Sequence, residues 1–93
     1  MVDLLIKNGL VIDGSGSPGF FAAVLVTGDT VNIRRGDVSG LEAARVIDAA
    51  GHVVCPGFVD LHSHAGLTIL GAPHHDPKVR QGVTTELVGI DGI

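Results

Sequence analysis

Aromatic residues other than histidine are scarce in this sequence, which has three phenylalanines and no tryptophan or tyrosine. A single cysteine, Cys55, cannot form an internal disulfide, and this agrees with a reducing compartment. No apolar run approaches the roughly 20 residues that span a bilayer, and the N-terminus lacks the basic, apolar and small-residue series of a signal peptide. We therefore expect a cytoplasmic protein with no membrane partner.

Positive charge is scarce as well. Six lysines and arginines stand against ten aspartates and glutamates, which gives a net charge of −4, and only Arg34 and Arg35 are adjacent. Because binding to a nucleic acid depends on clustered positive charge, we expect no nucleic acid partner.

Glycine, in contrast, is abundant. Fourteen glycines and four prolines in 93 residues favour short elements joined by tight turns, so we expect a mainly β chain. The length allows one domain, or one domain with a piece of another. The clearest turn signal is Asn8-Gly9, which lies between apolar runs at residues 3–7 and 10–13 and predicts a β-hairpin there.

A second hairpin is expected further along. Residues 20–27 are almost entirely apolar and predict a strand that is buried on both faces. Gly28-Asp29 can turn this strand back into residues 30–34. Residues 41–44 are compatible with a helical turn.

Two further short strands are predicted at residues 45–48 and 52–55, and Pro56-Gly57 then interrupts the pattern. We place a domain boundary at this point. It divides the chain into a first domain of residues 1–55 and a second, incomplete domain of residues 56–93.

The second domain has the element order of a parallel βαβ unit. Residues 58–62 predict a strand, and a loop containing glycine and proline follows as far as Pro73. Asp76-Pro77 is a good helix start and predicts a short helix over residues 77–81, and residues 83–88 form the next apolar run. Strand, loop, helix and strand in this order are typical of parallel pairing.

His62 and His64 are the strongest candidates for chemistry. In a strand, residues two apart point to the same face, so both imidazoles can converge on one ion. Two neutral imidazoles suit zinc or another divalent transition metal. Two histidines also share an exposed strand face by chance, so the pattern alone leaves both interpretations open.

Other polar residues have weaker claims. Asp60 has the same parity as the two histidines and could orient one of them by accepting its ring N–H, or it could be a solvated carboxylate at a strand end. For Cys55 we expect burial as a small hydrophobic residue. For His52 and His74-His75 we expect packing or solvated roles, with His75 the only one near the site.

The residues around the histidine pair resemble a known family. Residues 56–64 read PGFVDLHSH, and with residues 46–55 before them they resemble the opening of the amidohydrolase superfamily, whose first barrel strand ends in His-x-His. Residues 5–16 and 76–86 resemble the N-acyl-D-amino-acid deacylase, or D-aminoacylase, branch. The resemblance covers nearly the whole chain.

This resemblance implies a composite two-domain architecture. A small β-sandwich would contain the first strands of this chain, and a (β/α)₈ barrel would begin with the βαβ unit and hold the metal. It also implies a zinc-dependent amidohydrolase that acts on non-peptide C–N bonds, with one or two zinc ions. A metal-bound hydroxide would attack the amide carbonyl of a small-molecule substrate, and His62 and His64 would be the first two ligands.

One departure from the family concerns Asp91. Deacylases of this branch commonly have a metal-binding cysteine in the segment Val-Gly-Asn-Cys-Gly, where this sequence has Asp91 between Ile90 and Gly92. A carboxylate is a competent zinc ligand but is harder than a thiolate. Asp91 is therefore either a third ligand or a turn residue beside a glycine.

A (β/α)₈ barrel takes about 250 residues, so we expect these 93 residues alone to be inactive. The preferred interpretation is a fragment of a deacylase, and we expect it to self-associate through unpaired strand edges and exposed apolar surface. Two alternatives are another amidohydrolase activity, such as cyclic-amide opening or deamination, and a non-catalytic small β module.

Overall fold

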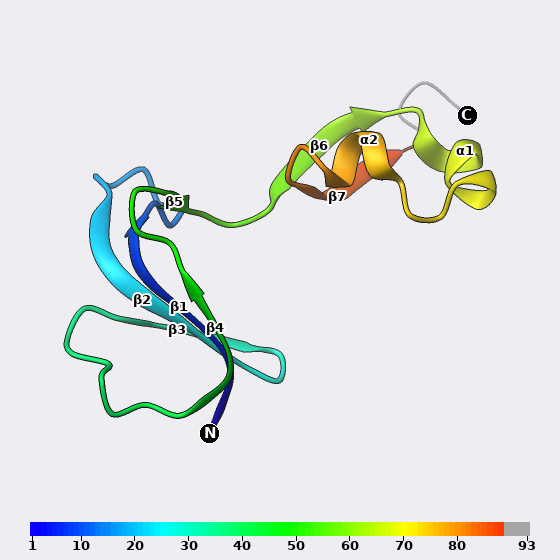
Figure 1. Ribbon diagram of the computed structural model, residues 1–93. Coiled ribbons are helices and arrows are strands. Elements are labelled where there is room, and N and C mark those ends of the chain that lie inside the picture. The colour runs from blue at the N-terminus through cyan, green and yellow to red at the C-terminus, as the bar shows by residue number, and fades with distance from the viewer. Residues whose placement is uncertain (89–93) are drawn as a thin grey trace. The chain divides into compact units, whose positions relative to one another are not determined.

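A computed structural model describes residues 1–88 of the chain. It has two compact units, one formed by Met1–Pro56 and the other beginning at Gly57 (Figure 1). Among the described residues, the regular elements of the first unit are all strands, and the second unit has two strands and two short helices, so the expectation of a mainly β chain is confirmed. In this described part, no helix has the length and hydropathy needed to cross a membrane.

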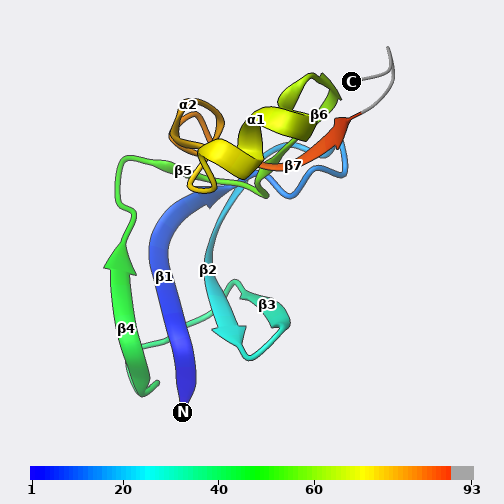
Figure 2. The same ribbon diagram turned by 90° about the vertical axis from the view of Figure 1, so that its right-hand side faces the viewer.

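The first unit is a single sheet built around strand β1. In chain order, its strands are β1 (Val2–Val11), β2 (Phe20–Thr27), β3 (Thr30–Arg34), β4 (Ala43–Asp48) and β5 (Val53–Val54). On one side, β1 pairs antiparallel with β2, which in turn pairs antiparallel with β3. On its other side, β1 pairs parallel with β4 and β5 in succession, so it lies between β2 and β4 (Figure 2).

The hairpin predicted at Asn8-Gly9 is wrong, because β1 runs through these residues without turning. Strand β2 pairs with β1 both before and after Asn8, and the register of this pairing shifts between Ile6 and Gly9. A β-bulge therefore absorbs the positive φ of Asn8, which is 67°. The Asn8 side chain donates a hydrogen bond of 3.0 Å to Asp48 at the end of β4, and this bond is the first cause of the lowered pKa of Asp48. Long-range pairing outweighs the local turn preference here.

The second predicted hairpin is confirmed. Thr27 pairs with Thr30 across Gly28-Asp29, and only Gly28 has a positive φ, as in a type II′ turn. Burial of β2 on both faces is also confirmed, since four consecutive residues from Ala22 to Leu25 are buried. They contribute to two small apolar clusters, one containing Leu5, Ala23 and Leu25 and the other containing Val11, Ala22 and Val24.

The helical turn considered for residues 41–44 is wrong, because β4 begins at Ala43. The backbone N–H of Val2 donates to Glu42 O at 3.1 Å, which draws this segment to the edge of β1. The two predicted strands after it are confirmed with different ends. The first is two residues longer than expected, and β5 is limited to Val53–Val54.

The second unit is a parallel βαβ arrangement, as predicted. Its elements are β6 (Phe58–Ser63), α1 (Ala65–Gly71), α2 (Asp76–Val79) and β7 (Val83–Val88), and β6 pairs parallel with β7. Helix α1 was not predicted, because its glycines and lack of charge resemble a loop. Gly57 allows the strands to approach, since a Cβ there would lie 2.7 Å from Thr84 Cβ.

The close packing of β1 against β5 gives a test of the fold. A Cβ added at Gly9 would lie 3.2 Å from Ala49 Cβ and would overlap Val54 Cγ2. We expect Gly9→Ala to lower the free energy of unfolding by about 1–3 kcal/mol through overpacking, measured by urea denaturation followed by circular dichroism. Gly36→Ala is the matched control, since a Cβ there meets nothing within 4 Å. Equal effects of the two substitutions would contradict the packing described here.

Candidate metal centre

The histidine pair lies where β6 ends. His62 is the second-last residue of the strand, His64 follows its last residue, and both are exposed. Their ring centroids are 5.3 Å apart and the ring planes are tilted by 48°. The two imidazoles are thus neighbours at the carboxyl end of a parallel strand, where α/β barrels hold their catalytic groups.

The spacing of these rings fits a shared metal ion. With Zn–N bonds of about 2.0–2.1 Å and tetrahedral angles, two imidazole centroids would lie roughly 5 Å apart. The observed 5.3 Å agrees with this separation. Among residues 1–88, however, no three side chains of histidine, cysteine, aspartate or glutamate are grouped so that they could hold an ion. The metal-binding role of the pair stays a prediction, and Asp91, the predicted third ligand, lies outside the described residues.

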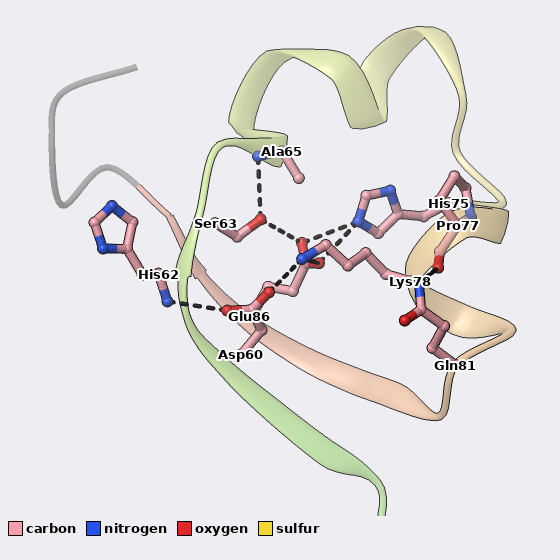
Figure 3. A network of polar contacts seen from close by, with 9 residues as sticks. All are labelled: Asp60, His62, Ser63, Ala65, His75, Pro77, Lys78, Gln81 and Glu86. Atoms are coloured by element: carbon pink, nitrogen blue, oxygen red, sulfur yellow. Dashed lines mark hydrogen bonds and ion pairs between the residues drawn. The ribbon is translucent and has the colours of Figure 1, made fainter.

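A bulge in β6 determines which residues share a face. Asp60 pairs with Glu86 and Ser63 pairs with Val88, so β6 has one residue more than β7 over this stretch. The parity argument that put Asp60 on the face of both histidines does not allow for this extra residue. Figure 3 shows the His62 ring on the other side of β6 from the contacts that Asp60 makes with Lys78.

The structure gives Asp60 a contact with the backbone of His62. Its Oδ1 accepts a hydrogen bond of 3.1 Å from the His62 N–H, and its Oδ2 accepts one from Lys78 of α2. The bond from Lys78 is the main cause that holds the pKa of Asp60 below its usual value, and the His62 N–H adds to it. In return, Asp60 raises the pKa of Lys78, so both groups stay charged near neutral pH.

Glu86 of β7 is the second carboxylate beside the histidine strand (Figure 3). It accepts a hydrogen bond of 3.1 Å from Ser63 Oγ and bonds of 2.9 and 3.0 Å from His75 Nε2. Lys78 Nζ lies 3.9 Å from it. We call these five residues, Asp60, Ser63, His75, Lys78 and Glu86, the Lys78 network.

The sequence reasoning missed three members of this network: Ser63, Lys78 and Glu86. One signal was available, because Glu86 is the only charged residue in the otherwise uncharged strand 83–88. Of the remaining histidines, His74 is exposed and the His52 ring lies 3.1 Å from Ala50 O, as expected for solvated or packing roles. Cys55 is exposed, so its predicted burial is wrong.

Comparison with known proteins identifies the family. The model of the amidohydrolase family matches residues 45–93, which include the histidine pair and both strands beside it. This match spans more than half of the sequence, and the chain belongs to the amidohydrolase family.

Three relatives illustrate the likeness. The D-aminoacylase of Alcaligenes xylosoxydans xylosoxydans is 43% identical over 98% of this chain. A crystal structure of N-acyl-D-glutamate deacylase from Bordetella bronchiseptica, complexed with zinc and a phosphonate inhibitor, superposes with a TM-score of 0.87 at 36% identity, covering 95% of this chain and 18% of that one. A D-aminoacylase structure with a binuclear metal centre has a TM-score of 0.84 at 43% identity, over 96% of this chain and 19% of that one. The chain spans 19% of the length of the curated D-aminoacylase.

Proposed function

We propose that this chain provides the first two metal ligands, His62 and His64, of a metal-dependent N-acyl-D-amino-acid deacylase. The observation that carries the proposal is the neighbouring pair of imidazoles at the end of β6, with ring centroids 5.3 Å apart, in a chain of the amidohydrolase family. The resemblance to D-aminoacylase and N-acyl-D-glutamate deacylase favours an acylated D-amino acid as the substrate.

Zinc is the metal we propose for this site. The imidazoles of His62 and His64 are ligands that suit zinc, and the similar N-acyl-D-glutamate deacylase was crystallised with zinc. When bound, such a metal lowers the pKa of water to roughly 7 and polarises an amide carbonyl. Another divalent transition metal, or a second ion, is compatible with the binuclear centre of the similar D-aminoacylase.

Asp91 remains a proposed ligand in the position where deacylases of this branch commonly have cysteine. A carboxylate there would make the site harder than one with a thiolate and would shift its metal preference away from soft ions. Asp60 would act on the pair by holding the His62 N–H at 3.1 Å, which fixes the backbone that carries the ligand.

The domain assignment supports the same proposal. Residues 1–55 would belong to a β-sandwich domain and residues 56–93 to the first βαβ part of a (β/α)₈ barrel. In such a barrel, residues at the carboxyl ends of the strands form the active site, and His62 and His64 are at such an end. The cytoplasmic location stays a prediction from the sequence.

Zinc content tests the metal ligands. We expect the purified protein to retain bound zinc after unbound metal is removed, and the double variant His62→Ala, His64→Ala to lose it, because two of its imidazole ligands are gone. The measurement is metal analysis by mass spectrometry. The control is His52→Ala, His74→Ala, which removes two exposed histidines elsewhere. Zinc retained equally by both double variants would refute the assignment of the ligands.

Substrate preference tests the activity. Because the 93 residues alone are expected to be inactive, the test uses a protein in which they are part of a complete barrel. We expect it to hydrolyse an N-acyl-D-amino acid to the free D-amino acid and a carboxylate, and to leave the L-enantiomer largely unchanged. Chromatography of the products measures this directly. Turnover of a cyclic amide with no turnover of acylated D-amino acids would instead favour the cyclic-amidase alternative.

Self-association of the 93-residue chain is a separate expectation. In β6 and β7, Phe58, Val59, Leu61 and Leu87 are each more than half exposed, and such apolar surface favours contact with another copy. We expect light scattering to give a mass above that of one 9.5 kDa chain, rising with concentration. A monomer at all concentrations would rule this out.

A further inference from the structure

Hydrogen bonds hold the backbone on both flanks of the histidine pair. On one flank, the N–H of His62 donates to Asp60 Oδ1 at 3.1 Å. On the other, the N–H of Ala65, which follows His64 and starts α1, donates to Ser63 Oγ at 3.2 Å. The segment that carries both imidazoles is therefore fixed by two side-chain acceptors.

Both acceptors are fixed in turn by the rest of the Lys78 network. Lys78 donates to the second oxygen of Asp60, while Ser63 Oγ donates to Glu86 at 3.1 Å. Lys78 Nζ also lies 3.9 Å from Glu86 Oε1, so one ammonium group lies between the two carboxylates (Figure 3). Helix α2 is thus connected to both flanks of the pair through one side chain.

We propose that Lys78 is a positioning residue for the two proposed metal ligands: it fixes Asp60 and Glu86, and these hold the backbone on either side of His62 and His64. The inference rests on the proposed metal-binding function. Lys78 acts through the two carboxylates.

The burial of the network separates this role from that of an ordinary surface ion pair. Ser63 is buried, the side chains of Glu86 and His75 are 11% and 17% exposed, and those of Asp60 and Lys78 are 23% and 35% exposed, so all five are at least partly shielded from water. Exposed ion pairs contribute little, because water screens them and long side chains lose entropy. Here Asp60 also accepts the His62 N–H, and Glu86 also accepts from Ser63 Oγ, so each carboxylate links Lys78 to the backbone on one side of the histidine pair.

The geometry of the α2 start gives independent support. His75 has a left-handed backbone with φ of 51°, an uncommon conformation for a residue other than glycine. It nevertheless places Nε2 within 2.9 Å of Glu86 Oε1 and begins the helix that carries Lys78. Strained backbone of this kind is kept where surrounding contacts hold it, and it clusters near functional sites.

Removal of the Lys78 charge should loosen the ligand pair. Without the ammonium group, Asp60 and Glu86 are two carboxylates with no cation between them, and Asp60 can turn away from the His62 N–H. Loss of a contact that orients metal ligands typically lowers metal affinity about 10- to 100-fold. We expect Lys78→Met to show a loss of this size, and Lys78→Arg, which keeps the charge, to recover most of it.

The test uses cobalt(II) as the probe metal in the purified protein. Titration gives the affinity, and the visible absorption bands report the coordination geometry, which a purely structural role in folding would leave unchanged. Hydrogen exchange at the His62 and Ala65 amides, measured without metal, reports the backbone directly and should be faster in Lys78→Met. The matched control is Arg80→Met, which removes a positive charge just beyond the same helix, where the side chain is outside the Lys78 network.

The outcomes separate this inference from the proposed function. In one outcome, the double variant His62→Ala, His64→Ala loses cobalt binding, while Lys78→Met keeps both the cobalt affinity and the shape of the absorption bands. This result would overturn the role of Lys78 and leave the metal assignment intact. Cobalt binding that persists in the double histidine variant would overturn both. Weaker binding with altered bands and faster amide exchange in Lys78→Met alone, recovered in Lys78→Arg, would establish the role.

Discussion

The parallel pairing of β6 with β7 is the constraint on which the candidate metal centre depends. It brings Asp60 beside Glu86, and the bulge that follows places Ser63 in the same network while the His62 ring lies on the other side of β6. Without the pairing, the two carboxylates would be 26 positions apart in the sequence with no reason to meet. The backbone that carries the histidine pair is therefore held in part by Glu86 of β7, through its hydrogen bond with Ser63.

Local sequence patterns predicted those elements whose partners are close in the chain. The hairpin at Gly28-Asp29 and the order of strand, helix and strand after Pro56 could be derived in this way, because turn chemistry and hydrophobic runs determine them. The histidine pair was also predictable, since His-x-His at the end of a strand is a compact signal. The two imidazoles are neighbours at the end of β6, and their metal-binding role stays a prediction.

Long-range contacts account for what could not be predicted. Asn8-Gly9 has the composition of a hairpin, but β2 and β4 supply better partners for both halves of β1, and the turn signal becomes a bulge. The Lys78 network joins β6, α2 and β7, and no spacing rule connects Lys78 to Asp60. The parity argument for Asp60 could not include the bulge after it, because an extra residue in one strand changes which later residues share a face.

The position of β1 at the centre of its sheet has a consequence for synthesis on the ribosome. One edge of β1 can pair as soon as β2 (residues 20–27) has been synthesised. The other edge pairs only with β4 and β5, at residues 43–48 and 53–54. This edge of β1 therefore keeps unpaired N–H and C=O groups until β4 and β5 are synthesised. Such open edges promote misassembly. Residues 43–54 therefore complete the sheet and remove this open edge.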